Sequence, residues 1–375
     1  MKVAIVQEWL VSVGGSEKVV YDIHKIFPDA PIYTLVYDKN NGPQWAKDLD
    51  IRTTKIQKIP MASKLYKNFL TLMPKAWEEL DLTEYDLIIS SNHSFDKCII
   101  TRPDALHICY CHSPIRYVWD LYYEYMEGAG FLKRLVFKHS VSKLRLIDYA
   151  SAQRVDYFIA NSYNIANRIR KFYRRDADVI YPGCPINKYA VKDNIGDYYL
   201  VVSRFVYYKR IDLAIEACNK LKKKLIIVGK GGEENNLKKI AGETIEFKGF
   251  CSDDELAQIY LNAKAFLFPG DEDFGITPVE AQSAGLPVLA YGRGGALETV
   301  LDGKTGLFFS EQTADSLAAC IEKFENEGVE YSKTEIREHS LKFSEERFLK
   351  EFKDYVFTKL DEFHDKLKFH KDYCD

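Results

Sequence analysis

Short apolar runs alternate with longer mixed segments along the whole chain. In the first half, the runs that read as buried strands lie at 2–7, 85–90, 106–111, 157–160 and 179–181. In the second half, they lie at 199–202, 225–229, 245–247, 265–268 and 288–291. Short strands separated by helical patterns are typical of parallel sheets whose crossover helices cover both faces. The pattern therefore predicts an α/β fold with two parallel sheets.

One interruption of this rhythm divides the chain. The strands stop at the Pro-Gly-Cys-Pro segment 182–185, polar residues follow at 192–197, and the strands restart at residue 199. A chain of 375 residues is also long for a single core and suits two domains of ordinary size. We therefore predict two Rossmann-like domains, at 1–190 and 191–345.

The last part of the chain is charged and carries an apolar stripe at helical spacing. The stripe consists of Phe348, Phe352, Tyr355, Val356, Leu360 and Phe363. Such a stripe most often packs against the rest of the protein. We predict a helical segment at 346–375 that crosses between the two domains.

Composition narrows the class of protein. A hydrophobic content of 46% is that of a globular protein, and a net charge of −3 gives no general attraction to nucleic acid. No run approaches the roughly 20 apolar residues that a membrane span needs. We therefore expect a cytoplasmic protein. The eight cysteines show no paired Cys-x-x-Cys spacing for zinc, so we expect buried, reduced thiols.

The segment 271–280 sets two carboxylates, Glu272 and Glu280, eight positions apart. The strand before it ends at Pro269-Gly270, so Glu272 is expected in a loop at the carboxyl end of that strand. Thr277 suits the N-cap of the next helix, which would place Glu280 in the first turn. Ligands bind at the carboxyl ends of strands in open α/β sheets, and helix N-termini attract phosphate. Both acids are therefore expected to border one crevice that could hold a nucleotide sugar.

A purely structural explanation of the same segment is also open. Thr277 and Glu280 have the spacing of a capping box, in which the Glu280 side chain returns to the Thr277 backbone. The acidic residues 271–273 could likewise form a solvated turn. Only the rest of the chain decides between the two explanations.

Two cations follow the first strand of the second domain. Arg204 and Lys209 come just after the strand 199–202, where a diphosphate could bind. Each charge-assisted hydrogen bond would contribute about 1.5–3 kcal/mol if it were shielded from water. The alternative is a solvated basic loop.

The first domain offers a weaker set of candidates. Gly14 and Gly15 follow the first strand and open a helix, where glycines let a phosphate approach the backbone amides closely. His112 follows the strand 106–111 and could face a sugar, although a structural histidine is the usual alternative. The glycines at 229–232 do not make a dinucleotide fingerprint, because Glu234 occupies the place of its third glycine.

Taken together, these residues resemble glycosyltransferase family 4, whose members have the GT-B fold. The resemblance covers nearly the whole chain, and the Glu-x7-Glu motif with its internal Phe274-Gly275-Ile276 is specific. Segments 111–117 and 292–300 are similar to bacterial O-antigen mannosyltransferases. The resemblance implies a retaining enzyme that works without a metal or other cofactor. Two Asp-x-Asp matches, at 176–178 and 271–273, are therefore not expected to hold an ion.

The resemblance also implies a role for each candidate residue. Glu272 would contact the hydroxyls of the donor sugar, with His112 nearby, and Glu280 would hold the ribose. Arg204 and Lys209 would bind the diphosphate. The backbone amides that would contact the donor belong to Phe274, Gly275 and Ile276 in the second domain, with Gly14 and Gly15 supporting the phosphate from the first.

We expect a mannosyltransferase that takes GDP-mannose and builds a polysaccharide or O-antigen on a saccharide or polyprenyl-diphosphate-linked acceptor. A UDP-sugar is the nearest alternative donor. A sugar-nucleotide 2-epimerase shares the two-lobe architecture, but it would give no reason for the glutamate motif. A non-catalytic sugar-nucleotide sensor is a further alternative.

Two basic segments of the first domain are candidates for membrane contact. Segment 63–77 sets apolar residues at helical spacing beside three lysines, and Pro74 is expected to end that helix early. Segment 131–145 mixes apolar residues with five cations. Either could meet an anionic bilayer at the inner face of the cell membrane or simply face the core.

Overall fold

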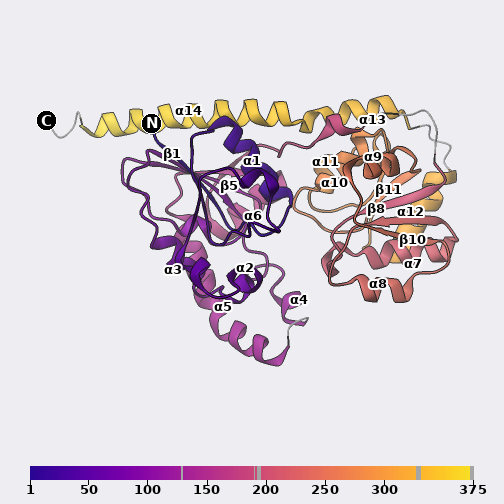
Figure 1. Cartoon of the computed structure of the whole chain (residues 1–375). Coiled ribbons are helices and arrows are strands. Elements are labelled where there is room, and N and C mark those ends of the chain that lie inside the picture. The colour runs from indigo at the N-terminus through magenta and orange to yellow at the C-terminus, as the bar shows by residue number, and fades with distance from the viewer. Residues whose placement is uncertain (128–129, 190, 192–195, 327–330, 372–375) are drawn as a thin grey trace. The chain divides into compact units, whose positions relative to one another are not determined.

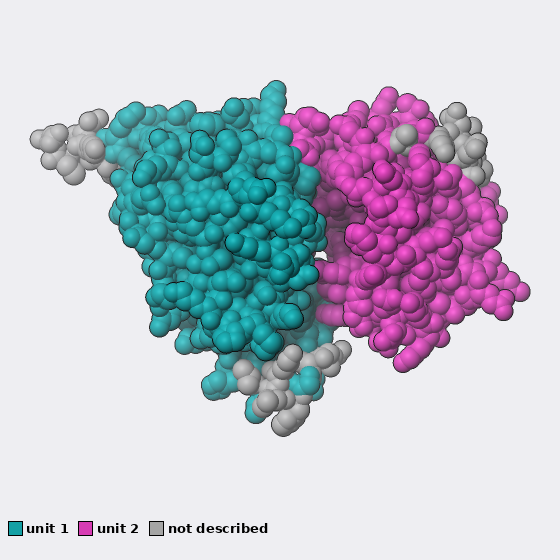
Figure 2. Space-filling view, in the orientation of Figure 1, with its two compact units in different colours: residues 1–182, 348–375 teal, residues 183–347 magenta. Residues whose placement is uncertain are grey.

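The computed structural model describes residues 1–127, 130–189, 191, 196–326 and 331–371. The chain forms two compact units (Figure 2). Unit 1 consists of residues 1–182 and 348–375, and unit 2 consists of residues 183–347. Unit 2 begins at Gly183, inside the Pro-Gly-Cys-Pro segment where the strand rhythm stops. Each unit is described below by itself.

Unit 1 contains a seven-stranded parallel sheet in the order β3-β2-β1-β4-β5-β6-β7. Strands β1 and β5 of this sheet are labelled in Figure 1. The strand order reverses between β1 and β4, which pair in parallel with Ile5 opposite Ile89. The strands are β1 (Val3–Gln7), β2 (Ile32–Thr34), β3 (Ile51–Thr53), β4 (Leu87–Asn92), β5 (Leu106–Cys111), β6 (Tyr157–Ala160) and β7 (Ala177–Val179).

Helices cover both faces of this sheet. The helices of unit 1 are α1 (Gly15–Ile26), α2 (Ala62–Leu65), α3 (Met73–Glu78), α4 (Tyr122–Glu127), α5 (Phe131–Ala152), α6 (Tyr163–Tyr173) and α14 (Glu345–Lys371), whose first residues belong to unit 2. One face packs against α3 and α5, which bury Trp77 and Leu144 beside Val6 of β1. The other face packs against α1 and α14, which bury Ile23 and Phe352 beside Ile5.

Unit 2 contains a six-stranded parallel sheet in the order β10-β9-β8-β11-β12-β13. The order reverses between β8 and β11, as it does between the first and fourth strands of a doubly wound fold. The strands are β8 (Tyr198–Val202), β9 (Lys224–Val228), β10 (Ile245–Gly249), β11 (Ala265–Phe268), β12 (Val288–Tyr291) and β13 (Gly306–Phe309).

Unit 2 also has a helical layer on each face of its sheet. Its helices are α7 (Ile211–Leu221), α8 (Glu234–Ile240), α9 (Asp253–Leu261), α10 (Ile276–Ser283), α11 (Ala296–Thr299), α12 (Ala314–Asn326) and α13 (Lys333–Ser340). Ile215 of α7 and Leu317 of α12 pack with Leu267 on one face. Tyr260 of α9 and Ala281 of α10 pack with Phe266 on the other. The predicted pair of α/β lobes is therefore confirmed.

The strand predictions hold best where a run is apolar and buried on both faces. The strands predicted at 106–111, 157–160, 265–268 and 288–291 have the predicted bounds. The strand predicted at 179–181 instead spans Ala177–Val179, and the prediction missed β2, β3 and β13. These elements are three or four residues long, so they present too few positions to show a pattern.

Two helix predictions are wrong, and each has a local cause. Pro74 does not end a helix, because it lies in the first turn of α3, where its missing N–H is not needed. Helix α10 begins at Ile276 with Gly275 as its N-cap, so the N-cap predicted at Thr277 is not formed. Glu280 is consequently the fifth residue of the helix and lies in its second turn.

Candidate functional site

The strand order of unit 2 places two loops side by side. Strands β8 and β11 are neighbours at the point where the order reverses, and the loop after β8 carries Arg204 and Lys209. The loop after β11 carries Glu272. In open α/β sheets, ligands bind outside the carboxyl ends of the strands at this point. The sheet therefore brings the predicted cations and the predicted acid to the expected ligand-binding edge.

Lys209 and Glu272 form an ion pair between these two loops. Their side chains keep exposed fractions of 18% and 16%, so the pair is partly shielded but open to solvent. The loops approach closely at Gly270, where an added β-carbon would lie 3.2 Å from the Lys209 carbonyl oxygen. Both charges are thus held in position at the end of the sheet.

The loop that carries Arg204 lies against the glycines at the end of β9. Its backbone donates from Phe205 N to Lys230 O at 2.9 Å. Gly229 has a φ of +135°, and a β-carbon there would collide with the Ser203 carbonyl oxygen. Arg204 itself is exposed. The glycines at 229–232, which do not make a dinucleotide fingerprint, therefore position the loop that carries Arg204, a residue predicted to bind the diphosphate.

A second glycine segment holds the loop that carries Glu272. Gly295 N donates to Glu272 O at 2.8 Å, and a β-carbon at Gly295 would collide with the backbone of Phe274. Arg293 Nε lies 3.3 Å from Asp271 Oδ2. Residues 293–295, within the segment 292–300 singled out in the sequence, thus contact the loop of the glutamate motif through a backbone hydrogen bond, a close backbone approach and an ion pair.

The start of α10 leaves backbone amides rather than a side-chain cap at the site. Gly275 caps the helix with a φ of +93°, which glycine adopts without strain, and it makes no side-chain cap hydrogen bond to the first amides. Phe274 is buried, with the centroid of its ring 5.6 Å from that of Phe343, so its ring packs inside unit 2 and only its backbone could contact a ligand. The capping box between Thr277 and Glu280 is absent, which removes the structural explanation of Glu280.

Glu280 lies beside an aromatic hydroxyl. Tyr260 of α9 donates to Glu280 Oε2 at 3.4 Å. Burial raises the pKa of Glu280 to about 7, while Lys188 and the Tyr260 hydroxyl lower it in part. The carboxyl group is therefore close to half-ionised at neutral pH, unlike an ordinary surface glutamate.

In unit 1, the predicted phosphate-binding glycines lie at the start of α1, after β1. Gly14 is the N-cap and the helix begins at Gly15, as predicted. Glu17 is buried in the first turn, where Ser16 Oγ donates to its Oε2 at 3.0 Å. A β-carbon at Gly14 would lie 2.8 Å from that same oxygen. The first turn thus already contains one carboxylate beside the amides.

His112 follows β5 and is half-buried. Its backbone N–H donates to Asn92 O at 2.8 Å, and its ring Nε2 lies 2.8 Å from Ser91 Oγ. The Tyr110 ring packs edge-on at 5.2 Å. Burial lowers the pKa of His112 to about 4, so the ring is neutral near pH 7.

Comparison with known proteins identifies the family. Residues 13–188 match the family model for glycosyltransferase family 4, and residues 188–342 match that for glycosyl transferases group 1. Together the two matches span residues 13–342. The chain belongs to glycosyltransferase family 4.

Several known proteins are similar to this chain at low to moderate identity. An uncharacterised glycosyltransferase of Methanocaldococcus jannaschii is 32% identical over 57% of this chain and 62% of its own length. The aligned region thus spans less than two thirds of that relative. The human α-1,3/1,6-mannosyltransferase ALG2 is 26% identical over 74% of each chain. The Anabaena protein HepE, solved with UDP and glucose, shares the fold with a TM-score of 0.70 at 18% identity, over 95% of this chain and 99% of its own.

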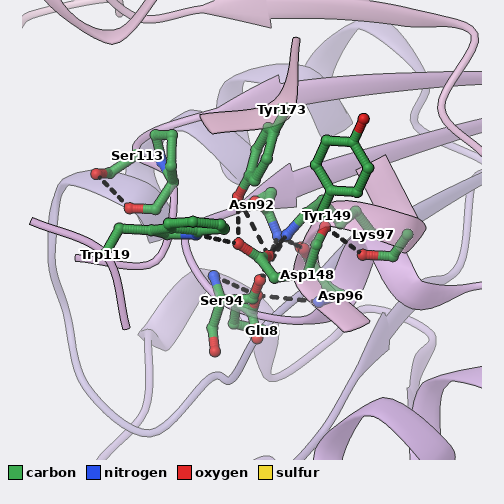
Figure 3. A network of polar contacts seen from close by, with 12 residues as sticks. Glu8, Asn92, Ser94, Asp96, Lys97, Ser113, Trp119, Asp148, Tyr149 and Tyr173 are labelled. Atoms are coloured by element: carbon green, nitrogen blue, oxygen red, sulfur yellow. Dashed lines mark hydrogen bonds and ion pairs between the residues drawn. The ribbon is translucent and has the colours of Figure 1, made fainter. Parts of the chain in front are cut away.

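This family 4 member has a buried polar network in unit 1 at the switch point, the place where the strand order reverses between β1 and β4 (Figure 3). Glu8, just after β1, has no exposed surface, and its Oε1 accepts from Ser94 N at 2.7 Å and from Asp96 N at 3.0 Å. Asn92 donates to both Glu8 and Asp96. Burial raises the pKa of Glu8 and brings that of Asp96 to about 6. Both carboxyl groups therefore stay protonated at pH values at which exposed carboxyl groups would already be ionised.

A second part of the network is a fully buried ion pair between Lys97 and Asp148 (Figure 3). Trp119 Nε1 donates to Asp148 Oδ2 at 2.7 Å, and the Tyr173 hydroxyl donates to the same oxygen at 2.9 Å. Lys97 also donates to Ser94 O at 2.9 Å. These contacts connect α5 and α6 to the loop after β4.

The structure brings the candidates together in two groups. Lys209 and Glu272 meet in unit 2 with Arg204 on the same loop as Lys209, and Glu280 lies on α10 after the Glu272 loop. Gly14, Gly15 and His112 belong to unit 1. Among the described residues, no group of three His, Cys, Asp or Glu side chains could hold a metal ion. Within the same residues, no helix has the length and apolarity to cross a bilayer.

Sequence reasoning missed the residues that support the candidates. Ser91 contacts His112. The sequence does indicate polar side chains at this place, because the polar residues 90–92 follow the apolar start of β4. Tyr260 contacts Glu280 from a different helix, and the sequence around it gives no sign of this role.

Proposed function

We propose that this protein is a retaining glycosyltransferase that moves mannose from GDP-mannose to a saccharide or polyprenyl-diphosphate-linked acceptor in polysaccharide or O-antigen synthesis. The observation that carries the proposal is the Lys209–Glu272 ion pair at the switch point of unit 2. A purely structural ion pair could form anywhere on the protein. This pair lies at the ligand-binding edge of the sheet, where the cation could bind a diphosphate and the carboxylate could bind a sugar.

The roles follow from the charges. Lys209 and Arg204 would bind the diphosphate and neutralise the charge that grows on it as it leaves. Glu272 would accept hydrogen bonds from sugar hydroxyls, and Glu280 would do the same for the ribose. The amides at 274–276 would contact the donor. In unit 1, the amides of Gly14 and Gly15 would support the phosphate.

Retention of configuration would follow from attack on the face that the diphosphate leaves. The acceptor oxygen forms a bond to the anomeric carbon as the bond from that carbon to the phosphate oxygen breaks, and the acceptor proton passes to the departing phosphate oxygen. No side chain of this chain is assigned as a covalent nucleophile. His112 would contact the sugar.

The donor base is the less supported part of the proposal. Mannose is favoured because the human relative, aligned over 74% of each chain, is named a mannosyltransferase. A UDP-sugar is the alternative, since HepE has the same fold and was solved with UDP and glucose.

We further propose that unit 1 contacts an anionic membrane on the cytoplasmic side while the acceptor is used. Helix α5 exposes Leu135 and Leu146 together with Lys138 and Lys143, and its one acid, Asp148, is buried. The side chains of residues 131, 132, 133 and 136 in the same segment lie outside the described residues. A basic and apolar helix face suits an anionic bilayer. Flotation with liposomes that contain anionic lipid should carry the protein upward, and absence of flotation would contradict this contact.

Calorimetric titration and thermal unfolding with GDP, UDP, GDP-mannose and UDP-sugars test the donor. A ligand that binds the native state must raise the melting temperature by mass action. Stabilisation by GDP compounds supports the mannosyltransferase, and stabilisation by UDP compounds alone redirects the donor. Tight binding without transfer or hydrolysis favours a sensor, and conversion of a UDP-sugar without an acceptor favours an epimerase.

The anomeric configuration of the product tests retention. NMR of the product formed from an α-linked donor should show an α-linkage, and a β-linkage would overturn the proposed mechanism.

A further inference from the structure

Ser91 and His112 are held together by the register of two strands. Ser91 lies in β4, has no exposed surface, and is the residue before Asn92. Asn92 pairs with Cys111 of β5, and the next backbone N–H, that of His112, donates to Asn92 O at 2.8 Å. The ring of His112 is thereby placed with Nε2 at 2.8 Å from Ser91 Oγ. The contact follows from the sheet pairing, which extends to the backbone N–H of His112, the first residue after β5.

The hydroxyl proton decides the direction of this hydrogen bond. Among the residues that the structure describes, the only hydrogen-bond partner of Ser91 Oγ is His112 Nε2. If Nε2 carried the ring proton and donated, the Ser91 hydroxyl proton would be buried without an acceptor, which is unfavourable. The hydroxyl therefore donates and Nε2 accepts. In a neutral imidazole, the ring proton then resides on Nδ1.

We propose that Ser91 is a positioning residue that fixes His112 as the Nδ1–H tautomer, so that His112 offers a hydrogen-bond donor to an oxygen of the sugar-diphosphate donor. This inference rests on the proposed function for the identity of the ligand. The described residues provide no partner for Nδ1. Burial keeps the ring neutral, as the lowered pKa of His112 indicates.

The fixed tautomer restricts the chemistry of the site. A nitrogen that already carries a proton cannot accept one from the acceptor hydroxyl, and Nε2 is occupied by Ser91. His112 consequently stabilises negative charge or orients a hydroxyl, and it does not act as the general base. The acceptor proton must leave by another route, which the departing phosphate oxygen supplies.

The same strand offers a matched control. Ser90 Oγ lies 2.9 Å from Nε2 of His107, and both residues are fully buried. His107 lies within β5 and is not a candidate site residue. Ser90→Ala therefore removes a hydrogen bond of the same kind from the same strand, and it leaves the Ser91–His112 contact in place.

Nitrogen NMR of the free protein, labelled with ¹⁵N in histidine, tests the tautomer without any substrate. Protonated and unprotonated ring nitrogens have well-separated ¹⁵N chemical shifts. The His112 signals are assigned by their loss in His112→Asn. We expect a protonated Nδ1 and a bare, hydrogen-bonded Nε2 in the native protein and in Ser90→Ala. A protonated Nε2 in the native protein would overturn the inference. In Ser91→Ala, the shifts should move toward a mixture of both tautomers.

Transfer kinetics test the consequence. Ser91→Ala should lower kcat on the order of tenfold, which corresponds to the loss of one well-oriented hydrogen bond, and should change KM for the donor less. Ser91→Thr keeps the hydroxyl and should restore both the tautomer and kcat, with the melting temperature as a check on its fold. Equal losses of kcat in Ser90→Ala and Ser91→Ala would show a merely structural role.

These results separate the two proposals. If the native protein transfers no sugar from any donor but shows the Nδ1–H tautomer, the proposed function fails and the assignment of Ser91 stands. If transfer occurs and the tautomer is the other one, only the assignment of Ser91 fails.

Discussion

Tyr260 donates a hydrogen bond of 3.4 Å to Oε2 of Glu280 and thereby joins α9 to α10 beneath the proposed ribose site. The contact stabilises a carboxylate that burial otherwise disfavours. Because the pKa of Glu280 is raised to about 7, its carboxyl group ionises near neutral pH.

Nucleotide affinity should therefore increase with pH through about 7. An ionised Glu280 accepts both hydrogen bonds from a ribose diol, whereas the protonated form accepts fewer. Calorimetric titration with the nucleotide that binds, from about pH 5.5 to about pH 8.5, should show affinity falling by at most about tenfold for each unit below the pKa, until only the weaker binding of the protonated form is left. Stability should change in the opposite direction, because a raised pKa means that the native state holds a proton that the unfolded state releases between about 4.5 and 7.

Two variants check this assignment. Glu280→Gln cannot titrate and should lose the pH dependence of binding. Tyr260→Phe removes a donor to the carboxylate and should shift the midpoint to higher pH. An unchanged pH profile in Glu280→Gln would show that another group is responsible.

Loss of the Lys209–Glu272 pair should affect turnover and binding differently. Glu272→Gln keeps the size of the side chain but removes the charge that orders the sugar, so kcat should fall on the order of 100-fold with a smaller change in donor affinity. Lys209→Met should weaken the binding of the diphosphate itself. Steady-state kinetics and calorimetry of both variants measure the difference.

The Lys220–Asp315 pair gives a control in the same unit. These side chains are 60% and 83% exposed, so Asp315→Asn should leave both transfer and binding unchanged. A loss in Asp315→Asn as large as that in Glu272→Gln would contradict a specific role for Glu272.

The glycine at 229 should be required for donor binding although it is not expected to touch the donor. Its φ of +135° and the neighbouring Ser203 carbonyl oxygen exclude a β-carbon, so Gly229→Ala must displace the loop that carries Arg204. We expect a loss of more than about 1 kcal/mol in stability and a weaker affinity for the nucleotide diphosphate. Gly232→Ala is the control, since nothing lies within 4 Å of a β-carbon there. Equal effects of the two substitutions would show that the close backbone approach is unimportant.

Removal of Asp148 should destabilise unit 1 strongly. Asp148→Ala leaves Lys97 buried without its charge partner, which costs about 3–5 kcal/mol. Urea unfolding measures the loss. Glu78→Ala breaks the half-exposed Arg154–Glu78 pair and should cost less than about 1 kcal/mol.

A double variant separates the lost charge pair from the lost packing. Lys97→Met combined with Asp148→Leu removes both charges, so it should be more stable than Asp148→Ala alone. If the double variant is the least stable, the hydrogen bonds from Trp119 and Tyr173 outweigh the buried charge.

Most of the fold could be predicted because buried parallel strands are continuous apolar runs. The run 106–111 gave β5 with its bounds, and the run 265–268 gave β11. Short edge strands such as β3 escaped because Ile51–Thr53 has three residues, with one apolar position. The start of α10 was predicted wrongly because Thr277 is a good N-cap residue. Gly275 is the N-cap instead, since glycine adopts the required backbone conformation with less strain.

The two α/β lobes and the chemistry that each candidate residue can offer follow from the amino-acid sequence alone. A run of apolar residues specifies a buried strand, and a glutamate or lysine after it specifies a charge at the end of the sheet, because both properties are local. The glutamate motif and the cations could be named for the same reason.

Which of these groups come into contact depends on how the elements pack in three dimensions. Lys209 pairs with Glu272, Tyr260 with Glu280 and Ser91 with His112 because strand order and register place residues far apart in sequence beside one another. Burial then set the charge states, as for the raised pKa of Glu280 and the lowered pKa of His112. Neither effect is local, since both depend on which other elements cover a side chain.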